Sequence, residues 1–94
     1  MYIRIVRGQP QPGQVEEVAK RWQEHLAPRL REIPGFRAGY LIGEPQGTAA
    51  IGVTIWDDKP GEALTQAMGE FRQRIQDIAS GPPSIEDYEV LAEA

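Results

Sequence analysis

The sequence predicts a single α+β domain in which two helices cover one face of a four-stranded antiparallel sheet. Three observations carry this prediction: four short runs have strand-like composition, two longer segments repeat apolar residues at helical spacing, and stretches rich in Gly and Pro separate them. The chain has 94 residues, the size of one small domain, so residues 1–94 are taken as one unit.

Four short segments have the composition of β-strands. Residues 2–7 form a β-branched run that ends at Gly8. Residues 36–42 and 49–56 flank the stretch GEPQGT, whose glycines and proline are typical of a hairpin loop. The last strand is expected in the run SIEDYEVLAE, which begins at Ser84.

Two segments repeat apolar residues every three or four positions, as expected for helices that pack on one side. The first spans residues 14–33; Trp22 lies at the centre of its apolar face, where it is expected to be core, and Pro28 is expected to kink it. The second is expected over residues 61–80, with the acidic pair at 57–58 as its cap. Strand, helix, strand, strand, helix, strand is the ferredoxin-like βαββαβ order.

Alternation along residues 49–56 predicts which side of the sheet packs under the helices. The odd-numbered residues form one apolar face, which is expected to be the core. The other face carries small residues and one large aromatic, as the floor of a cavity would: Ala50, Gly52, Thr54 and Trp56. The uncovered face of the sheet, with Trp56, Val6 and either Leu41 or Tyr40 on it, predicts that the chain pairs with a second copy of itself, sheet to sheet.

Three short motifs resemble those of one family. They are I-P-G-F at residues 33–36, T-I-W-D at residues 54–57 and Y-E-V-L at residues 88–91. Over essentially the whole chain the sequence resembles the antibiotic biosynthesis monooxygenase family. The resemblance implies a dimeric α+β barrel, in which two ferredoxin-like sheets face each other. That superfamily includes cofactor-free monooxygenases, haem-degrading oxygenases, small isomerases and decarboxylases, so the motifs specify the fold far better than the reaction.

The resemblance implies a homodimer that binds a small apolar or aromatic molecule between sheet and helices and oxygenates it without metal, flavin or another cofactor. In such a mechanism the substrate supplies the electron to dioxygen, and the protein positions and deprotonates the substrate. The alternative is a non-catalytic homodimeric module of the same fold that binds a ligand or serves in a stress response. Haem degradation is disfavoured, because the family's iron-binding histidine lies on the second helix and residues 61–80 contain none.

Four residues are the candidates for substrate binding: Tyr2, Arg4, Thr54 and Trp56. If the isoleucines face the helices, Tyr2 and Arg4 point toward the cavity beside Thr54 and Trp56, whose indole can stack on a flat ligand or donate its N–H. The alternatives are that Trp56 is a structural aromatic at the edge of the dimer interface, and that Arg4 pairs with a carboxylate of the last strand. His25 is the candidate general base, since a neutral imidazole accepts protons near neutral pH. The alternative is that His25 is a half-exposed surface residue beside Glu24 and Arg29.

The composition excludes several classes of protein and site. The chain has no cysteine and one histidine, so no disulfide, thiolate or histidine-based metal site is expected. Ten Lys and Arg against fourteen Asp and Glu give a net charge of −4, which is the wrong sign for a general nucleic-acid binder. No apolar run reaches the roughly 18–20 residues of a membrane span. The N-terminus lacks the pattern of a signal peptide, so a cytoplasmic location is expected.

Overall fold

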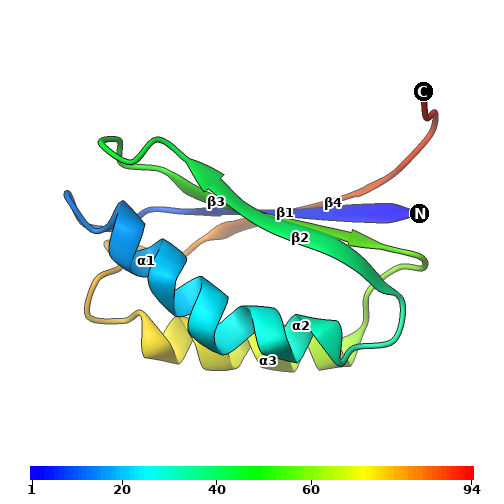
Figure 1. The fold of residues 1–94 in the computed structure, drawn as a ribbon, viewed down its shortest axis with the longest axis horizontal. Helices are drawn as coiled ribbons and strands as arrows, with labels where there is room; N and C mark the ends of the chain where they lie inside the picture. Colours follow the sequence, from blue (N-terminus) through cyan, green and yellow to red (C-terminus); the bar gives the residue numbers. More distant parts are fainter.

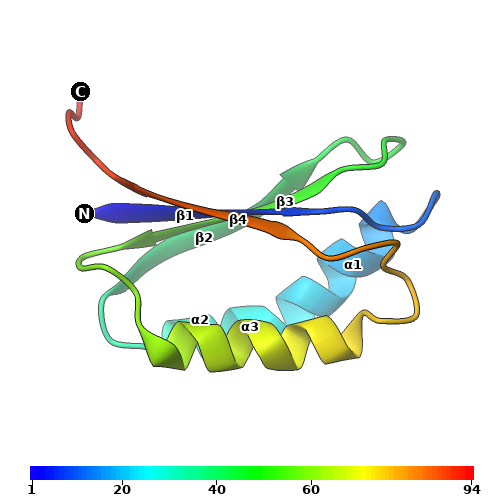
Figure 2. The ribbon, with the colours of Figure 1, turned by 180° about the vertical axis from the view of Figure 1, so that it is seen from behind.

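A four-stranded antiparallel sheet forms one layer of the molecule, and helices cover one of its faces (Figure 1). The computed structural model describes all 94 residues. The strands are β1 (Tyr2–Gly8), β2 (Phe36–Gly43), β3 (Ala50–Trp56) and β4 (Ser84–Glu89). Their spatial order is β2-β3-β1-β4, and every neighbouring pair is antiparallel. The ferredoxin-like order expected from the sequence is therefore confirmed, and the view from behind in Figure 2 shows all helices on the same side of the sheet.

The first helical segment is continuous but changes its winding in the middle. It consists of α1 (Val15–Arg21), a π-helical turn η1 (Trp22–Leu26) and α2 (Ala27–Arg31). Pro28 has no N–H, and in a regular α-helix its ring would clash with the carbonyl of Glu24, four residues earlier. In the wider turn the Ala27 N–H donates to the Trp22 carbonyl, five residues earlier, which relieves this conflict. One π turn thus accommodates the proline where the sequence suggested a kink.

The second helix is shorter than expected and begins without a side-chain cap. It is α3 (Glu62–Arg74), with Gly61 at its N-cap, and the residues that follow it form turns. The prediction that Asp57 and Asp58 cap this helix is wrong, because the N-cap residue is Gly61 and the helix begins at Glu62. The backbone N–H of Asp57 instead donates to the carbonyl of Gly35, which ties the end of β3 to the start of β2.

The helices cover the face of β3 that the sequence assigned to the open side. Trp56 is 1% exposed, and Ala50 is also buried. Residues directly opposite each other in an antiparallel pair share a face, so Tyr2, which is opposite Trp56, lies on this covered face too. The prediction that the odd-numbered residues of β3 pack under the helices is therefore wrong. The helices and the turn after α3 complete the core with Val18, Trp22, Leu26, Ala27, Leu30, Leu64, Ala67, Phe71 and Ile78.

No helix covers the opposite face of the sheet (Figures 1 and 2), and the register of the strands places many apolar side chains on it. Tyr40 of β2 lies directly opposite Val53 of β3 on this face and is 57% exposed. Of the residues expected there, Tyr40 is confirmed, whereas Trp56, Val6 and Leu41 lie on the covered face. The other apolar members of this open face are Ile3, Ile5, Ala38, Ile42, Ile51, Ile55 and Tyr88. The ion pair of Arg7 and Glu86 lies at the β1–β4 side of the same face. A sheet face so rich in apolar side chains is unusual for the solvent side of a monomer.

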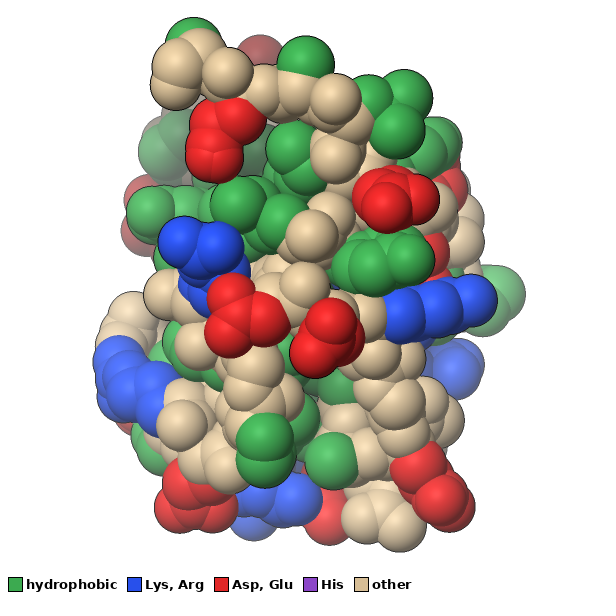
Figure 3. All heavy atoms as spheres, turned by 90° about the vertical axis from the view of Figure 1, so that its right-hand side faces the viewer, with side chains coloured by type: hydrophobic (Ala, Val, Ile, Leu, Met, Phe, Trp, Pro, Cys, Tyr) green, Lys and Arg blue, Asp and Glu red, His purple; other side chains and the backbone are tan.

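Figure 3 shows the end of the molecule at which β1 and β2 begin and β3 ends. Acidic and basic side chains are interspersed over it, with apolar side chains between them. Arg37 and Asp57 form one of the ion pairs at this end, with 3.4 Å between Nη1 and Oδ1. This surface therefore carries no patch of a single charge sign. None of the helices is both long enough and apolar enough to pass through a membrane.

The buried hydrogen bond between Trp56 and Thr54 predicts the stability of one variant. The indole N–H donates to Oγ1 of Thr54 at 2.8 Å, and both side chains are buried. Thr54→Val preserves the shape of the side chain but leaves the indole N–H without an acceptor. We expect the free energy of unfolding to fall by about 1–3 kcal/mol, measured by urea denaturation. Thr48→Val in the exposed hairpin is the control, and an equal effect of both variants would contradict the prediction.

Candidate functional site

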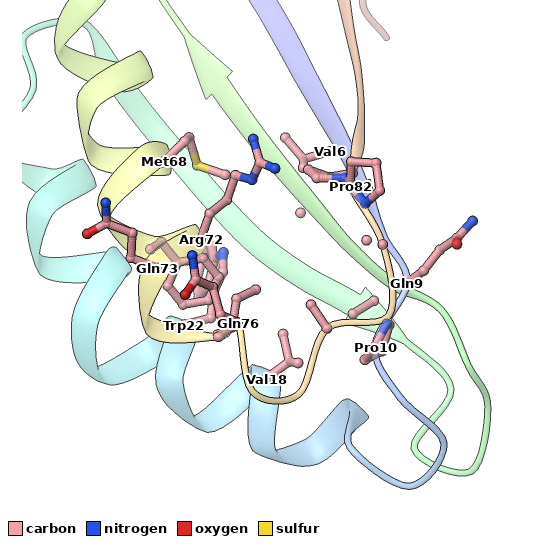
Figure 4. A pocket seen from close by; sticks show the side chains of 18 of the residues that line it. Val6, Gln9, Pro10, Val18, Trp22, Met68, Arg72, Gln73, Gln76 and Pro82 are labelled. Carbon is pink, nitrogen blue, oxygen red and sulfur yellow. The ribbon is translucent and has the colours of Figure 1, made fainter.

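A cavity of about 510 Å³ lies between the sheet and the helices, at the end of the sheet where β1 ends and β3 begins (Figure 4). Its volume is in the range of small-molecule sites. Strands β1, β2 and β3 contribute the floor with Val6, Gly8, Leu41, Ala50 and Gly52. The helices contribute Val18, Trp22, Met68, Phe71 and Arg72, among others. The cavity is thus mainly apolar and lies within a single chain.

Gly52 opens the space above the sheet because it has no side chain. A Cβ placed on Gly52 would lie 3.8 Å from Nε1 of Trp22 and 4.0 Å from Cβ of Val6. These are ordinary van der Waals distances, so a methyl group fits there and a larger side chain would occupy the cavity. The prediction that the small residues of β3 form a cavity floor is confirmed for Ala50 and Gly52, although the cavity lies under the helices.

Trp22 forms part of both the core and the cavity wall. The side chain is 8% exposed, as expected of a core residue, yet it lines the cavity. Its indole N–H makes no hydrogen bond within the protein, and no side-chain nitrogen or oxygen without a partner is fully enclosed. The Trp22 N–H is therefore open to the cavity, where it can donate a hydrogen bond to a ligand.

The remaining polar groups of the cavity come from one arginine and three amides. Arg72 of α3 is the only ionisable side chain among the lining residues, and Gln9, Gln73 and Gln76 are the amides. Such groups can donate hydrogen bonds and hold an anion, but none of them accepts a proton near neutral pH. The cavity can therefore bind and orient a molecule, while any proton that leaves must go to the solvent or to a second reactant.

Two loops close one end of the cavity. The segment after β1 runs beside the segment after α3, where Pro10 and Ala79 form an isolated antiparallel bridge. The backbone N–H of Ser80 donates to the carbonyl of Gln9 at 2.8 Å. Its hydroxyl donates to the same carbonyl at 2.6 Å. Pro10 and Ala79 both line the cavity, so this pairing forms one of its walls.

The four predicted substrate-binding residues share one face of the sheet, as expected. Tyr2 is opposite Trp56, and Arg4 is opposite Thr54. They lie toward the end of the sheet away from the cavity, and none of the four is among its lining residues. The Trp56 ring packs edge-on against Phe36, with 5.3 Å between ring centroids. Trp56 is thus a structural aromatic, but it lies in the core under the helices and not at the edge of an interface on the open face.

Arg4 is paired within the chain, as its alternative interpretation predicted. Its Nε and Nη2 donate to the two carboxylate oxygens of Asp87 on β4, at 2.7 and 3.0 Å. The Arg4 side chain is 13% exposed, so the carboxylate compensates a largely buried charge. The hydrogen bonds from Arg4 hold the pKa of Asp87 below its ordinary value of 3.8.

His25 lies on an exposed part of η1. Its Nε2 is 4.0 Å from the carboxylate of Glu24, and it is not among the residues that line the cavity. The prediction of a general base at His25 therefore gains no support from the geometry. No group of three or more His, Asp or Glu side chains is placed where it could hold a metal ion.

Arg72 was not predicted as a cavity residue, although the sequence contains a signal for it. Met68, Arg72 and Gln76 are each four positions apart, so they form one row along α3 and the turn that follows it. All three line the cavity. A row that places a charge and an amide in line with an apolar residue marks the border of a helix face, where side chains reach a cleft.

Several solved structures have a fold similar to that of this chain. A monooxygenase from the gene ActVA-Orf6 of Streptomyces coelicolor, solved with the ligand nanaomycin D, superposes with a TM-score of 0.78 at 18% identity, covering 99% of this chain and 89% of that one. A protein of unknown function from Nitrosomonas europaea, NE2512, superposes with a TM-score of 0.75 at 23% sequence identity. The match covers 99% of this chain and 91% of that one. The structure of an antibiotic biosynthesis monooxygenase superposes with a TM-score of 0.71 at 15% sequence identity. The match covers 98% of this chain and 100% of that one.

These similarities establish the fold. Structures of antibiotic biosynthesis monooxygenases are among the neighbours, so the resemblance stated from the sequence is confirmed at the level of the fold. No family model and no curated protein sequence matches the chain.

The pair of Arg4 and Asp87 predicts a pH dependence of stability. Because the pKa of Asp87 is lowered in the folded protein, its contribution to stability is present above the ordinary pKa of 3.8 and is lost as the pH falls through the lower folded value. We expect Asp87→Asn to make the loss of unfolding free energy shallower as the pH is lowered from about 5. Urea denaturation across this pH range measures it. Glu93→Gln in the exposed tail is the control and should leave the slope unchanged.

Proposed function

We propose that the cavity binds a small, mainly apolar aromatic molecule and that the protein is a cofactor-independent monooxygenase acting on it. The observation that carries this proposal is an open apolar cavity with a few hydrogen-bond donors at its border, between the sheet and the helices. A flat aromatic ring suits such a space, since one oxygen substituent can reach the Trp22 N–H while the ring lies over Gly52. The fold shared with the Streptomyces coelicolor monooxygenase supports this assignment.

The reaction we propose converts an activated ring carbon into a carbonyl. The substrate is a polycyclic phenol or its keto tautomer, which loses a proton and gives electrons to dioxygen directly. One oxygen atom forms the new carbon–oxygen double bond, two hydrogens leave that carbon, and they depart with the other oxygen atom as water. All electrons that dioxygen takes up come from the substrate, so no external reductant is needed. The protein contributes positioning and stabilisation of the anion.

The second candidate function is a non-catalytic ligand-binding module. It is favoured by one observation: no lining side chain of the cavity can act as a base near neutral pH. The two functions differ in an oxygen electrode experiment. With anthrone as the probe, the monooxygenase should consume oxygen and form anthraquinone faster than the spontaneous reaction does. A binding module should bind anthrone and leave that rate unchanged, which would exclude our first proposal.

We propose further that two copies associate through the open face of the sheet. That face presents Val53, Tyr40 and the isoleucines of β1, β2 and β3 to solvent in the single chain. Covering it removes a large apolar area from water, which provides the main driving force for association. A stable homodimer of this kind buries roughly 1,200–2,000 Å² in total.

Val53→Asp tests the proposed dimer. Val53 lies at the centre of the open face, so the single chain should fold with an aspartate there, while the dimer would bury an unpaired carboxylate. We expect sedimentation velocity to show a dimer for the natural sequence and a folded monomer for the variant. Gln66→Asp on the exposed side of α3 adds the same charge and should remain dimeric. A monomer for the natural sequence would refute the proposal.

A series at Gly52 tests whether the cavity is the binding site. Gly52→Ala adds a methyl group at van der Waals distance from its neighbours and should leave ligand affinity nearly unchanged. Gly52→Leu fills the space beside Trp22 and should weaken the binding of anthrone, and slow its oxidation, by at least about tenfold. Fluorescence titration and oxygen uptake measure the two effects. Both variants should keep their unfolding free energy within about 1 kcal/mol, since the site is a cavity. Undiminished binding by Gly52→Leu would place the site elsewhere.

A further inference from the structure

Arg72 is the one charge in the wall of the cavity. The chain as a whole has an excess of acidic residues, yet no Asp or Glu lines this space. A ligand in the cavity therefore meets a positive charge and no negative charge at close range. This asymmetry favours a ligand with a negative charge, and it disfavours a cationic one.

The Arg72 guanidinium has no carboxylate partner within the protein. Five other arginines form ion pairs: Arg4, Arg7, Arg21, Arg29 and Arg37. Arg72 takes part in no ion pair and no side-chain hydrogen bond, although its planar group has five donors available. Among the arginines without an ion pair, Arg72 is the one that lines the cavity. Its donors are free for a ligand.

The Arg72 side chain extends from α3 toward the sheet. Figure 4 shows it reaching from the helix in the direction of Val6 and Pro82, next to Met68. All four of these residues line the cavity. Arg72 thus lies at the border of a mainly apolar space, one turn along α3 from Met68. Arg72 itself is exposed to solvent, so what an oxygen anion gains there is charge-assisted hydrogen bonds from the planar guanidinium.

We infer that the ligand is an aromatic anion, with its ring over Gly52 beside Trp22 and its negatively charged oxygen on Arg72. This inference rests on the proposed function and narrows its substrate class to aromatic molecules whose oxygen substituent is ionised when bound. A carboxylate and a phenolate share this chemistry. With a phenol, Arg72 favours the ionised form and so lowers the pKa of the bound molecule, which supplies the electron-rich anion that reacts with dioxygen.

The first experiment compares 2-naphthoate with its uncharged isostere 2-naphthamide. We expect the natural sequence to bind the carboxylate at least about tenfold more tightly, which corresponds to about 1.4 kcal/mol. Arg72→Gln should remove this preference while leaving the affinity for the amide within about twofold. Arg74→Gln is the matched control, because Arg74 is also without an ion pair but does not line the cavity.

The second experiment identifies the anion. The ultraviolet spectrum of 1-naphthol, titrated with pH in the presence of saturating protein, gives the apparent pKa of the bound phenol. A lower pKa with the natural sequence than with Arg72→Gln indicates that Arg72 holds a phenolate. If the pKa is the same with both proteins while the naphthoate preference depends on Arg72, the site holds a carboxylate.

The outcomes separate this inference from the proposed function. If both naphthalene probes bind equally and Gly52→Leu abolishes both, the cavity is a ligand site but Arg72 does not select an anion, and the inference fails alone. If Arg72→Gln and Arg74→Gln lower the naphthoate affinity equally, the preference reflects general charge, and the inference also fails. If neither probe binds, or Gly52→Leu changes nothing, the inference and the proposed site fail together.

Discussion

Burial of the Trp56 indole under the helices determines which side of the sheet is interior. The ring packs edge-on against Phe36, and its N–H is satisfied by Thr54 on the same strand. Because side chains alternate along a strand, this arrangement also turns Gly52 toward the helices and Val53 away from them. The cavity, the covered core and the open apolar face therefore all follow from which face of β3 lies under the helices. A shift of one residue in that strand would exchange all three.

The order and type of the elements could be predicted from the sequence, but the orientation of the sheet could not. Composition and turn residues mark strands and helices locally, so β1 to β4 appear within a few residues of their expected positions. The face of a strand that becomes interior depends on what the helices bring to it. Both faces of β3 are apolar, and alternation alone favours the isoleucines over Trp56. The helices instead provide a space that the large indole fills.

The residues of the candidate site could also be predicted only in part from the sequence. The small side chains of β3 correctly indicated a cavity, but its other walls come from residues remote in sequence, among them Trp22. His25 was selected for its chemistry, and whether it faces a cleft depends on the phase of the helix. The π turn at residues 22–26 departs from 3.6 residues per turn, so a regular helical projection fails there. Arg72 lies on a regular helix, where such a projection holds.

The two loops that close one end of the cavity link ligand residence time to local unfolding. They are joined by a few hydrogen bonds, among them those from Ser80 to Gln9 and from Gln11 to Ile78. Segments held in this way open at a lower free energy than the whole domain. A molecule that contacts these loops loses part of its binding wall when they separate, so backbone hydrogen bonds that it does not touch contribute to its dissociation rate. Its binding in turn protects the amides of Gln11 and Ser80 from hydrogen exchange.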